Sequence, residues 1–204
     1  ILIFITTMLV AGTLGIDTSS LLAILSVAGL AVSLSVQSSL SNVASAMMIL
    51  TSKPFRAGDY VQLGDKAGTV LTIGAIYTSL RTYDNQIIYI PNSQVTAAAI
   101  VNCTSAETRR VDLSFSASYD DAPDTVRKTL CGAAVDCGKA LTDKPIEAHV
   151  TGYGESSVNY VLRFWVRTAD YWDAYNDVMD RMKSAFDAAD ISMTYPHINV
   201  HMDS

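Results

Sequence analysis

The chain of 204 residues carries 14 Lys and Arg against 20 Asp and Glu, so its formal net charge is −6, and 50% of its residues are hydrophobic. A net acidic chain argues against nucleic acid as a partner, because phosphate backbones attract basic surfaces. Cys103, Cys131 and Cys137 form no CxxC pair, which is typical of core cysteines in a reduced compartment rather than of a disulfide framework.

The charges are unevenly distributed along the chain. Asp17 is the only ionisable side chain before Lys53, and all 14 Lys and Arg follow. This pattern predicts a membrane part followed by a soluble part. Residues 1–16 would rise only roughly 24 Å as a helix, so we expect the end of a transmembrane helix. The opening ILIFITTMLV, without an initiator Met or a signal-peptide n-region, indicates that membrane segments are missing upstream.

Residues 17–53 form the second predicted membrane segment. As one helix it would be roughly 50 Å long, which exceeds the bilayer core of about 30 Å. We therefore expect a break near residues 37–39, where Gln37, Ser38 and Ser39 interrupt the apolar run. Lys53 and Arg56 follow the segment and suit lipid phosphates on a cytoplasmic side.

A helical wheel of this segment predicts three faces. One stripe holds Ala23, Val27, Leu30, Leu34, Gln37 and Ser41. Small residues form a groove on one flank, at Ser26, Gly29 and Ser33, and Ala31 lies on the other flank. A helix with a groove and a small knob can pack head-to-tail with copies of itself and close a ring. The stripe would then face the axis, with Leu30 and Leu34 as an apolar constriction that gates by dewetting. The alternative is that both leucines are packing residues of an ordinary helical bundle.

A longer motif favours the pore. The stretch AGLAVSLSVQSSLSNVASAMMILTSKPFRAGDYVQLGDKAGTVLTI, followed by RTYD and IPNS, resembles the small-conductance mechanosensitive channel (MscS) family. The similarity runs from about residue 20 to the end and includes YPHINV. It implies a homoheptamer in the cell (inner) membrane, multi-pass, with the C-terminal domains in the cytoplasm and a bent pore-lining helix. It also implies that Leu30 and Leu34 are the gate, that Ser26, Gly29 and Ser33 are groove positions, and that Ala31 is the knob.

The chain departs from the family at several of these positions. Well-known members have glycine where this chain has Ser26 and Ser33, and alanine at Val27. They also have glycine at Ser38, directly after Gln37, and a second flexible glycine at Ala46. Serine still permits close approach but lacks the backbone freedom of glycine. The position of the helix bend at Gln37, Ser38 and Ala46 is therefore open, whereas the pore stripe is preserved.

The soluble part is predicted to contain two modules. Residues 54–105 read as strands separated by glycine turns and suggest a five-stranded barrel, which is Sm-like in the family. An RNA-binding module is the rival reading, and the acidic balance argues against it. Residues 106–195 alternate strands and helices and predict an α+β ferredoxin-like domain. Its second helix, residues 170–189, is expected to bury Trp172, Tyr175, Val178, Met182 and Phe186. Residues 196–204 are expected to add a strand to a terminal barrel.

No catalytic set is evident, so no enzyme, cofactor or metal is predicted. His197, Asn199 and His201 share one face of the last predicted strand, and the simplest interpretation is a solvated face. Asp120, Asp121 and Asp124 stand where a helix begins, and we interpret them as capping acids.

The function expected from the sequence is therefore a mechanosensitive ion channel that is opened by membrane tension and releases ions and small solutes on hypo-osmotic shock. Its expected partners are copies of itself, membrane lipids and the permeating solutes. Two alternatives stay open on the same scaffold, a solute exporter and a ligand-regulated channel.

Overall fold

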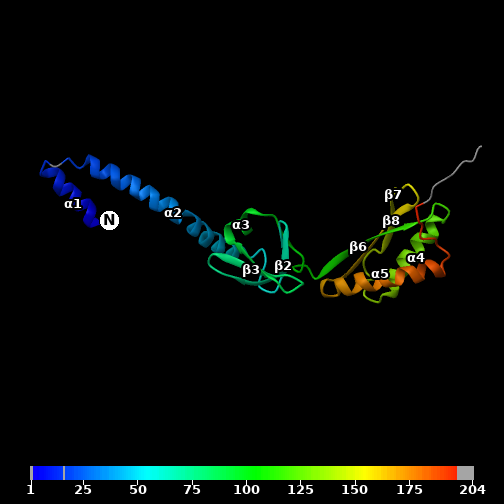
Figure 1. Cartoon of the computed structure of the whole chain (residues 1–204). Helices are drawn as coiled ribbons and strands as arrows, with labels where there is room; N and C mark the ends of the chain where they lie inside the picture. The colour runs from blue at the N-terminus through cyan, green and yellow to red at the C-terminus, as the bar shows by residue number, and fades with distance from the viewer. Residues whose placement is uncertain (1, 16, 197–204) are drawn as a thin grey trace, which may run out of the picture. The chain divides into compact units, whose positions relative to one another are not determined.

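The computed structural model describes residues 2–15 and 17–196 (Figure 1). The chain divides into two compact units, Ile1–Asn102 and Cys103–Ser204. The terminal strand expected at residues 196–204, with His197, Asn199 and His201, lies almost entirely outside the described residues. Only Pro196 of that segment is described, and it is not in a strand.

The first unit begins with two helices, α1 (Leu2–Thr13) and α2 (Ser19–Ser52). Gly15 adopts a left-handed conformation (φ +78°) in the turn between them. The carboxylate of Asp17 then accepts the Ser19 amide N–H at 2.9 Å and satisfies one of the free N–H groups at the start of α2. The lone acid of the membrane part therefore begins the second helix.

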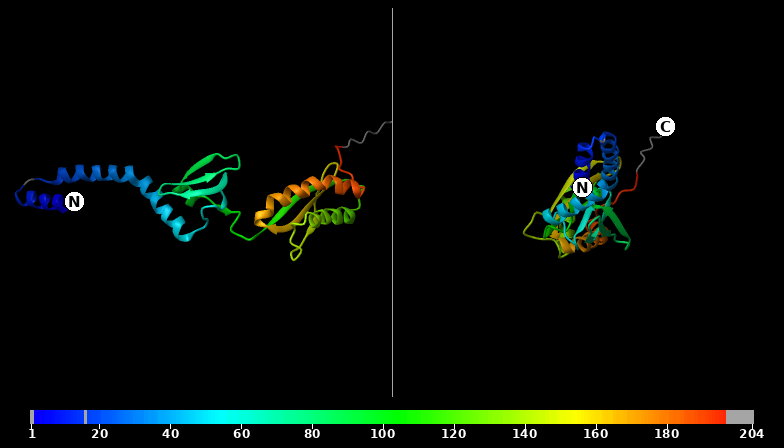
Figure 2. Two further views of the ribbon diagram at one scale, coloured as in Figure 1. Left: turned by 90° about the horizontal axis from the view of Figure 1, so that it is seen from below. Right: turned by 90° about the vertical axis from the view of Figure 1, so that its left-hand side faces the viewer.

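Helix α2 is continuous, and residues 37–39 do not interrupt it. The predicted interruption of the helix is wrong, because Gln37, Ser38 and Ser39 all keep helical structure. Figure 2 shows that the axis of α2 instead changes direction along its length. Long helices can curve without losing their hydrogen bonds. Helix α2 also contains no proline, the residue that most often breaks a helix.

A five-stranded antiparallel sheet follows α2 in the first unit, in the order β4-β3-β2-β1-β5. Its strands are β1 (Tyr60–Leu63), β2 (Lys66–Ile73), β3 (Tyr77–Arg81), β4 (Ile87–Pro91) and β5 (Ile100–Asn102). A short helix, α3 (Asn92–Ala97), connects β4 to β5 and was not expected from the sequence. The sheet has free edges at β4 and β5 within one chain, so closure into an Sm-like barrel stays a prediction.

The core of this sheet also includes two residues that precede it in the chain. Ile49 of α2 and Phe55 after it are 1% and 2% exposed, and they join the buried sheet residues Val61, Leu63, Val70, Leu80 and Ile90 and Val95 of α3. The end of α2 is thus part of the hydrophobic core of the sheet, and this packing attaches the helix to the sheet.

The second unit contains a three-stranded antiparallel sheet in the order β6-β8-β7, with two helices on one face (Figure 1). Its elements are β6 (Thr108–Ala117), α4 (Pro123–Asp136), β7 (Glu147–Tyr153), β8 (Val158–Arg167), a 3-10 turn η1 (Thr168–Asp170) and α5 (Tyr171–Ala188). This β-α-β-β-α order follows the elements expected over residues 106–195. The ferredoxin-like fold itself stays a prediction, because its fourth strand would fall after the described residues.

Two expectations for the second unit are confirmed only in part. Helix α5 buries Ala174, Val178, Met182 and Phe186, whereas Trp172 is 48% exposed and Tyr175 is half-buried, because Trp172 is rotated away from the buried face by the helical repeat. Asp124 lies in the first turn of α4, as expected for an acid at a helix N-terminus, but none of the three acids makes a side-chain cap for that helix. Instead, the Asp121 carboxylate accepts the Ser118 amide at 3.0 Å and the Ser192 amide at 3.1 Å, and it holds together two segments far apart in sequence.

Candidate pore-lining site

Helix α2 has two parts that differ in burial. Residues 19–41 are all exposed in the isolated chain, whereas Ser45, Ala46 and Ile49 further along are buried. By length and composition α2 could cross a membrane, and no other helix among the described residues meets that test. An exposed apolar helix is unstable in water, so its first part requires lipid or further protein around it.

The continuous helix places the expected gate residues on one face. Leu30 and Leu34 are each 61% exposed and lie one helical turn apart. Val27, one turn earlier, is 69% exposed. The remaining stripe positions, Ala23, Gln37 and Ser41, are exposed as well. The structure therefore leaves the whole stripe free for other copies or for water.

The flanks of the stripe carry small side chains, and the space beside them is open. A side-chain carbon added at Gly29 would meet nothing within 4 Å. The Ser26 hydroxyl donates to the Leu22 carbonyl of its own helix at 2.7 Å, so its polarity is satisfied without a partner helix. Ser33 lies on the same flank, and Ala31 lies on the other; both are exposed.

The second part of α2 is hydrogen-bonded to helix α3. The Asn42 side chain bridges the two elements, because its Nδ2 donates to the Ser38 carbonyl at 2.9 Å and its Oδ1 accepts the Ser93 amide at 3.0 Å. The Thr96 hydroxyl donates to the Ser45 hydroxyl at 3.1 Å. Ala46 is 5% exposed beside this contact. Ser38, an expected bend residue, is thus linked through one side chain to the first turn of α3.

The segment that follows α2 turns the chain into the sheet. Lys53 adopts a left-handed conformation (φ 48°) and its amide donates to Ile49 at 2.8 Å, which ends the helix. Gly58, with φ +96°, has a conformation that favours glycine. The Asp59 carboxylate accepts the Arg56 amide at 2.9 Å and the Asn102 side chain at 2.8 Å. The charged groups of Lys53 and Arg56 form no ion pair with the described residues and are exposed.

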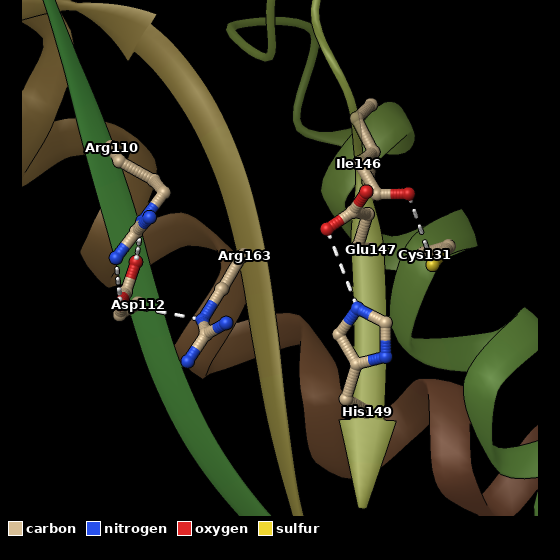
Figure 3. A network of polar contacts seen from close by, with 7 residues as sticks. All are labelled: Arg110, Asp112, Cys131, Ile146, Glu147, His149 and Arg163. Atoms are coloured by element: carbon tan, nitrogen blue, oxygen red, sulfur yellow. Dashed lines mark hydrogen bonds and ion pairs between the residues drawn. The ribbon is translucent and has the colours of Figure 1, made fainter.

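The second unit carries a network of charges on its sheet (Figure 3). Arg110 donates to Asp112 at 2.6 Å and 2.9 Å, and Arg163 lies 3.6 Å from the same carboxylate. His149 lies 3.3 Å from Glu147. The Asp112 carboxylate raises the pKa of Arg110, and burial raises the pKa of the Cys131 thiol. These ion pairs are exposed, and the described residues contain no cluster of His, Cys, Asp and Glu suited to a metal.

The site therefore contains both predicted and unpredicted residues. The sequence predicted which residues of α2 share a face, because this depends only on helical spacing, and the continuous helix preserves that spacing. It missed Asn42, Ser45, Ser93 and Thr96, whose contacts join residues 51 positions apart. An asparagine within an apolar helix was the available signal, since a buried amide requires hydrogen-bond partners.

Comparisons with known proteins identify the family of the chain. Residues 38–105 match the family model described as "Mechanosensitive ion channel, beta-domain", and residues 111–193 match "Mechanosensitive ion channel MscS, C-terminal". An uncharacterized MscS family protein of Buchnera aphidicola subsp. Schizaphis graminum is 37% identical over 98% of this chain and 71% of its own length. The small-conductance mechanosensitive channel of Edwardsiella ictaluri is 37% identical over 86% of this chain and 61% of its own length.

Solved structures lead to the same family. The crystal structure of Helicobacter pylori MscS in its closed state has a TM-score of 0.90 and 27% identity, over 98% of this chain and 80% of that chain. The Arabidopsis thaliana MSL1 structure has a TM-score of 0.77 over 94% of this chain and 72% of that chain, and at 20% identity it supports the fold alone. The chain belongs to the MscS family of mechanosensitive ion channels.

Proposed function

We propose that this chain forms an ion channel opened directly by membrane tension, with a ring of α2 helices around the pore. The observation that carries the proposal is that α2 leaves its leucine stripe wholly exposed in a single copy, in a chain of this family. In a membrane that contains additional copies, lipid can cover the apolar surface of α2, and neighbouring α2 helices can pack against its small flanks.

Leu30 and Leu34 form the gate in this proposal. With the stripe turned to the axis, each copy contributes two leucines, and a narrow apolar ring excludes water. Ala23, Val27, Gln37 and Ser41 line the rest of the pore. Ser26, Gly29, Ser33 and Ala31 let adjacent helices approach closely, so a small rotation or tilt can withdraw the leucines.

The soluble sheet supports assembly into a ring. Its two free edges expose large apolar side chains, with Ile87 and Tyr89 at 52% and 67% on β4 and Val101 at 51% on β5. Edge strands with such side chains require cover, and β4 of one copy meeting β5 of the next covers both. The family resemblance implies a ring of seven copies. It also implies a location in the cell membrane, with the soluble part in the cytoplasm.

Tension acts through the difference in membrane area between the closed and open states. Stretching the bilayer favours the wider state, in which the α2 helices move apart and the pore wets. Lys53 and Arg56 lie at the membrane surface in this arrangement and contact lipid phosphates. The opened pore then releases ions and small solutes after sudden dilution of the medium.

The decisive experiment is a patch-clamp recording of the full-length protein in plain lipid with stepped suction. We expect currents above a threshold tension without any added ligand. Silence up to membrane rupture, with protein confirmed in the bilayer, would exclude direct gating by tension. Flux that saturates and selects one solute would instead indicate an exporter.

A further inference from the structure

A cavity of about 260 Å³ lies between the turn from β1 to β2, strand β4 and helix α3. Its apolar wall includes Leu63, Ile90 and Val95, which are 4%, 8% and 0% exposed. Pockets for drug-sized ligands measure about 300–1,000 Å³. This cavity is therefore suited to a smaller molecule that has an apolar part.

Polar groups of both signs line the same cavity. Asp65 in the turn and Lys66 at the start of β2 form an ion pair at 2.9 Å, and both side chains are exposed. The hydrogen bond from Lys66 lowers the pKa of the Asp65 carboxyl, so both groups are charged at neutral pH. The exposed side chain of Gln94 adds an amide, which can both donate and accept. The cavity thus presents a cation, an anion and an amide together with an apolar wall.

The balance of charge selects the kind of ligand. A ligand with one charge would be attracted by one member of the ion pair and repelled by the other, whereas a zwitterion can pair with both. An α-amino acid carries its ammonium and its carboxylate on a single carbon atom, so it presents both signs close together. An aliphatic side chain on that carbon can then contact Leu63, Ile90 and Val95. The cavity therefore matches a free α-amino acid with an aliphatic side chain.

We propose that this cavity binds a free aliphatic α-amino acid and that the bound molecule opposes opening of the channel. The binding site follows from the geometry of the first unit alone. The effect on opening rests on the proposed function, since it assumes a pore formed by α2.

Helix α3 connects the cavity to the pore helix. It contributes Gln94, Val95 and Ala98 to the cavity. Two other residues of this short helix hydrogen-bond to α2, Ser93 through its amide at 3.0 Å and Thr96 through its hydroxyl at 3.1 Å. A ligand shifts an equilibrium only through its different affinity for the two states. An amino acid packed against α3 favours the state in which α3 and α2 keep this contact, so it should raise the tension needed for opening.

Thermal unfolding of the full-length protein in detergent tests the binding site. L-leucine in excess should raise the midpoint of unfolding, because a ligand that binds only the folded state stabilises it. Glycine lacks the aliphatic side chain, isocaproate lacks the ammonium and isoamylamine lacks the carboxylate, so each should shift the midpoint less. The absence of a shift with leucine, or equal shifts with all four compounds, would overturn the inference.

Matched variants locate the site. Lys66→Met removes the charge that pairs with the carboxylate, at an exposed position away from the core. Ala98→Leu fills the cavity from α3, whereas Ala97→Leu places the same side chain on an exposed neighbour that does not line it. We expect the leucine-dependent shift to be lost in the first two variants and kept in Ala97→Leu. A shift that persists in both Lys66→Met and Ala98→Leu would place the amino acid elsewhere and contradict the proposal.

Patch-clamp recording tests the effect on the channel. Leucine should raise the threshold tension of the unmodified protein, and the threshold of Lys66→Met should not respond to leucine. A thermal shift with an unchanged threshold would overturn the effect on opening and support the site alone. A thermal shift in a protein without tension-gated currents would refute the proposed function and leave the site intact. Lighter particles of Ala98→Leu in native mass spectrometry, with no leucine-dependent shift in the unmodified protein, would show that a second copy fills the cavity instead.

Discussion

Leu30 and Leu34 illustrate how much the surroundings of a side chain decide its role. Each leaves 61% of its surface exposed in the single chain. In a membrane, lipid or neighbouring copies can cover such a leucine, whereas water cannot do so favourably. In the proposed ring the same apolar surface would exclude water from a narrow pore, so one property would serve both assembly and closure.

Substitution of Leu34 tests the gate directly. A lysine there should hydrate the constriction, so Leu34→Lys is expected to pass current at rest and to impair growth of cells that express it. Leu34→Ile keeps the apolar ring and should stay closed without tension. Resting currents of Leu34→Lys that match those of the unmodified protein would show that this position is not the constriction.

Gly68 shows a different constraint at the residue scale. A Cβ at this position would lie 2.7 Å from the Arg81 carbonyl oxygen, which is backbone and cannot easily move. We expect Gly68→Ala to destabilise the first unit by about 1–3 kcal/mol, measured as a lower midpoint of thermal unfolding in detergent.

The control for this substitution is Gly132→Ala. Gly132 is in the middle of α4 with nothing within 4 Å of an added Cβ. Alanine is the better helix former, so this variant should be more stable by about 0.5–1 kcal/mol. Equal midpoints for the two variants would show that the contact at Gly68 relaxes without cost.

At the scale of elements, side-chain hydrogen bonds of Asn42 and Ser45 join α2 to α3, the short helix between β4 and β5. Asn42 joins the Ser38 carbonyl to the Ser93 amide, and the buried Ile49 continues the contact into the core. A change in the direction of α2 therefore moves α3, because the hydrogen bonds and the packing connect the same two helices.

Asn42→Leu removes both hydrogen bonds at similar volume. The Ser93 amide loses its partner, which costs about 1–3 kcal/mol, so we expect faster amide hydrogen exchange across α3 in the full chain. Asn42→Asp keeps an acceptor for Ser93 and loses only the donor to Ser38, so its α3 exchange should stay close to that of the unmodified protein. Unchanged exchange in Asn42→Leu would contradict the link.

At the scale of the whole molecule, each unit has its own core, and the first unit also has surfaces that a single copy leaves uncovered. These surfaces are the stripe and flanks of α2 and the two free edges of the five-stranded sheet. Among the described residues β4 and β5 are the edge strands of this sheet, and an exposed edge favours pairing with another copy. Membrane and soluble surfaces thus both favour assembly.

A charge on one edge should weaken that assembly. Val101→Asp introduces an unpaired carboxylate into the proposed contact between β5 and β4 of neighbouring copies, and burying it would cost several kcal/mol. We expect lighter particles in native mass spectrometry, while the circular dichroism spectrum stays unchanged. Val101→Thr keeps the β-branched shape and should assemble as before. Particles of full mass in the Val101→Asp variant would exclude this edge from the interface.

The sequence alone determined the features that depend on neighbours along the chain. The uncharged run before Lys53 predicted the membrane helix, and helical spacing predicted the stripe of Leu30 and Leu34. Turn glycines and alternation predicted the strands, and the order of motifs identified the family. The apolar helix, the strands and the family are confirmed, because hydrophobic periodicity and turn chemistry are local properties, whereas the role of the leucine stripe stays a prediction.

Only the tertiary structure decided the contacts between distant segments. It showed α2 continuous through Gln37–Ser39, Asn42 bound to Ser93 across 51 positions, and Asp121 bound to Ser192 across 71 positions rather than acting as a cap for α4. It also exposed Trp172, which the sequence placed in the core. Polar groups take whichever partner the completed fold brings near, and that choice depends on packing that no local pattern encodes.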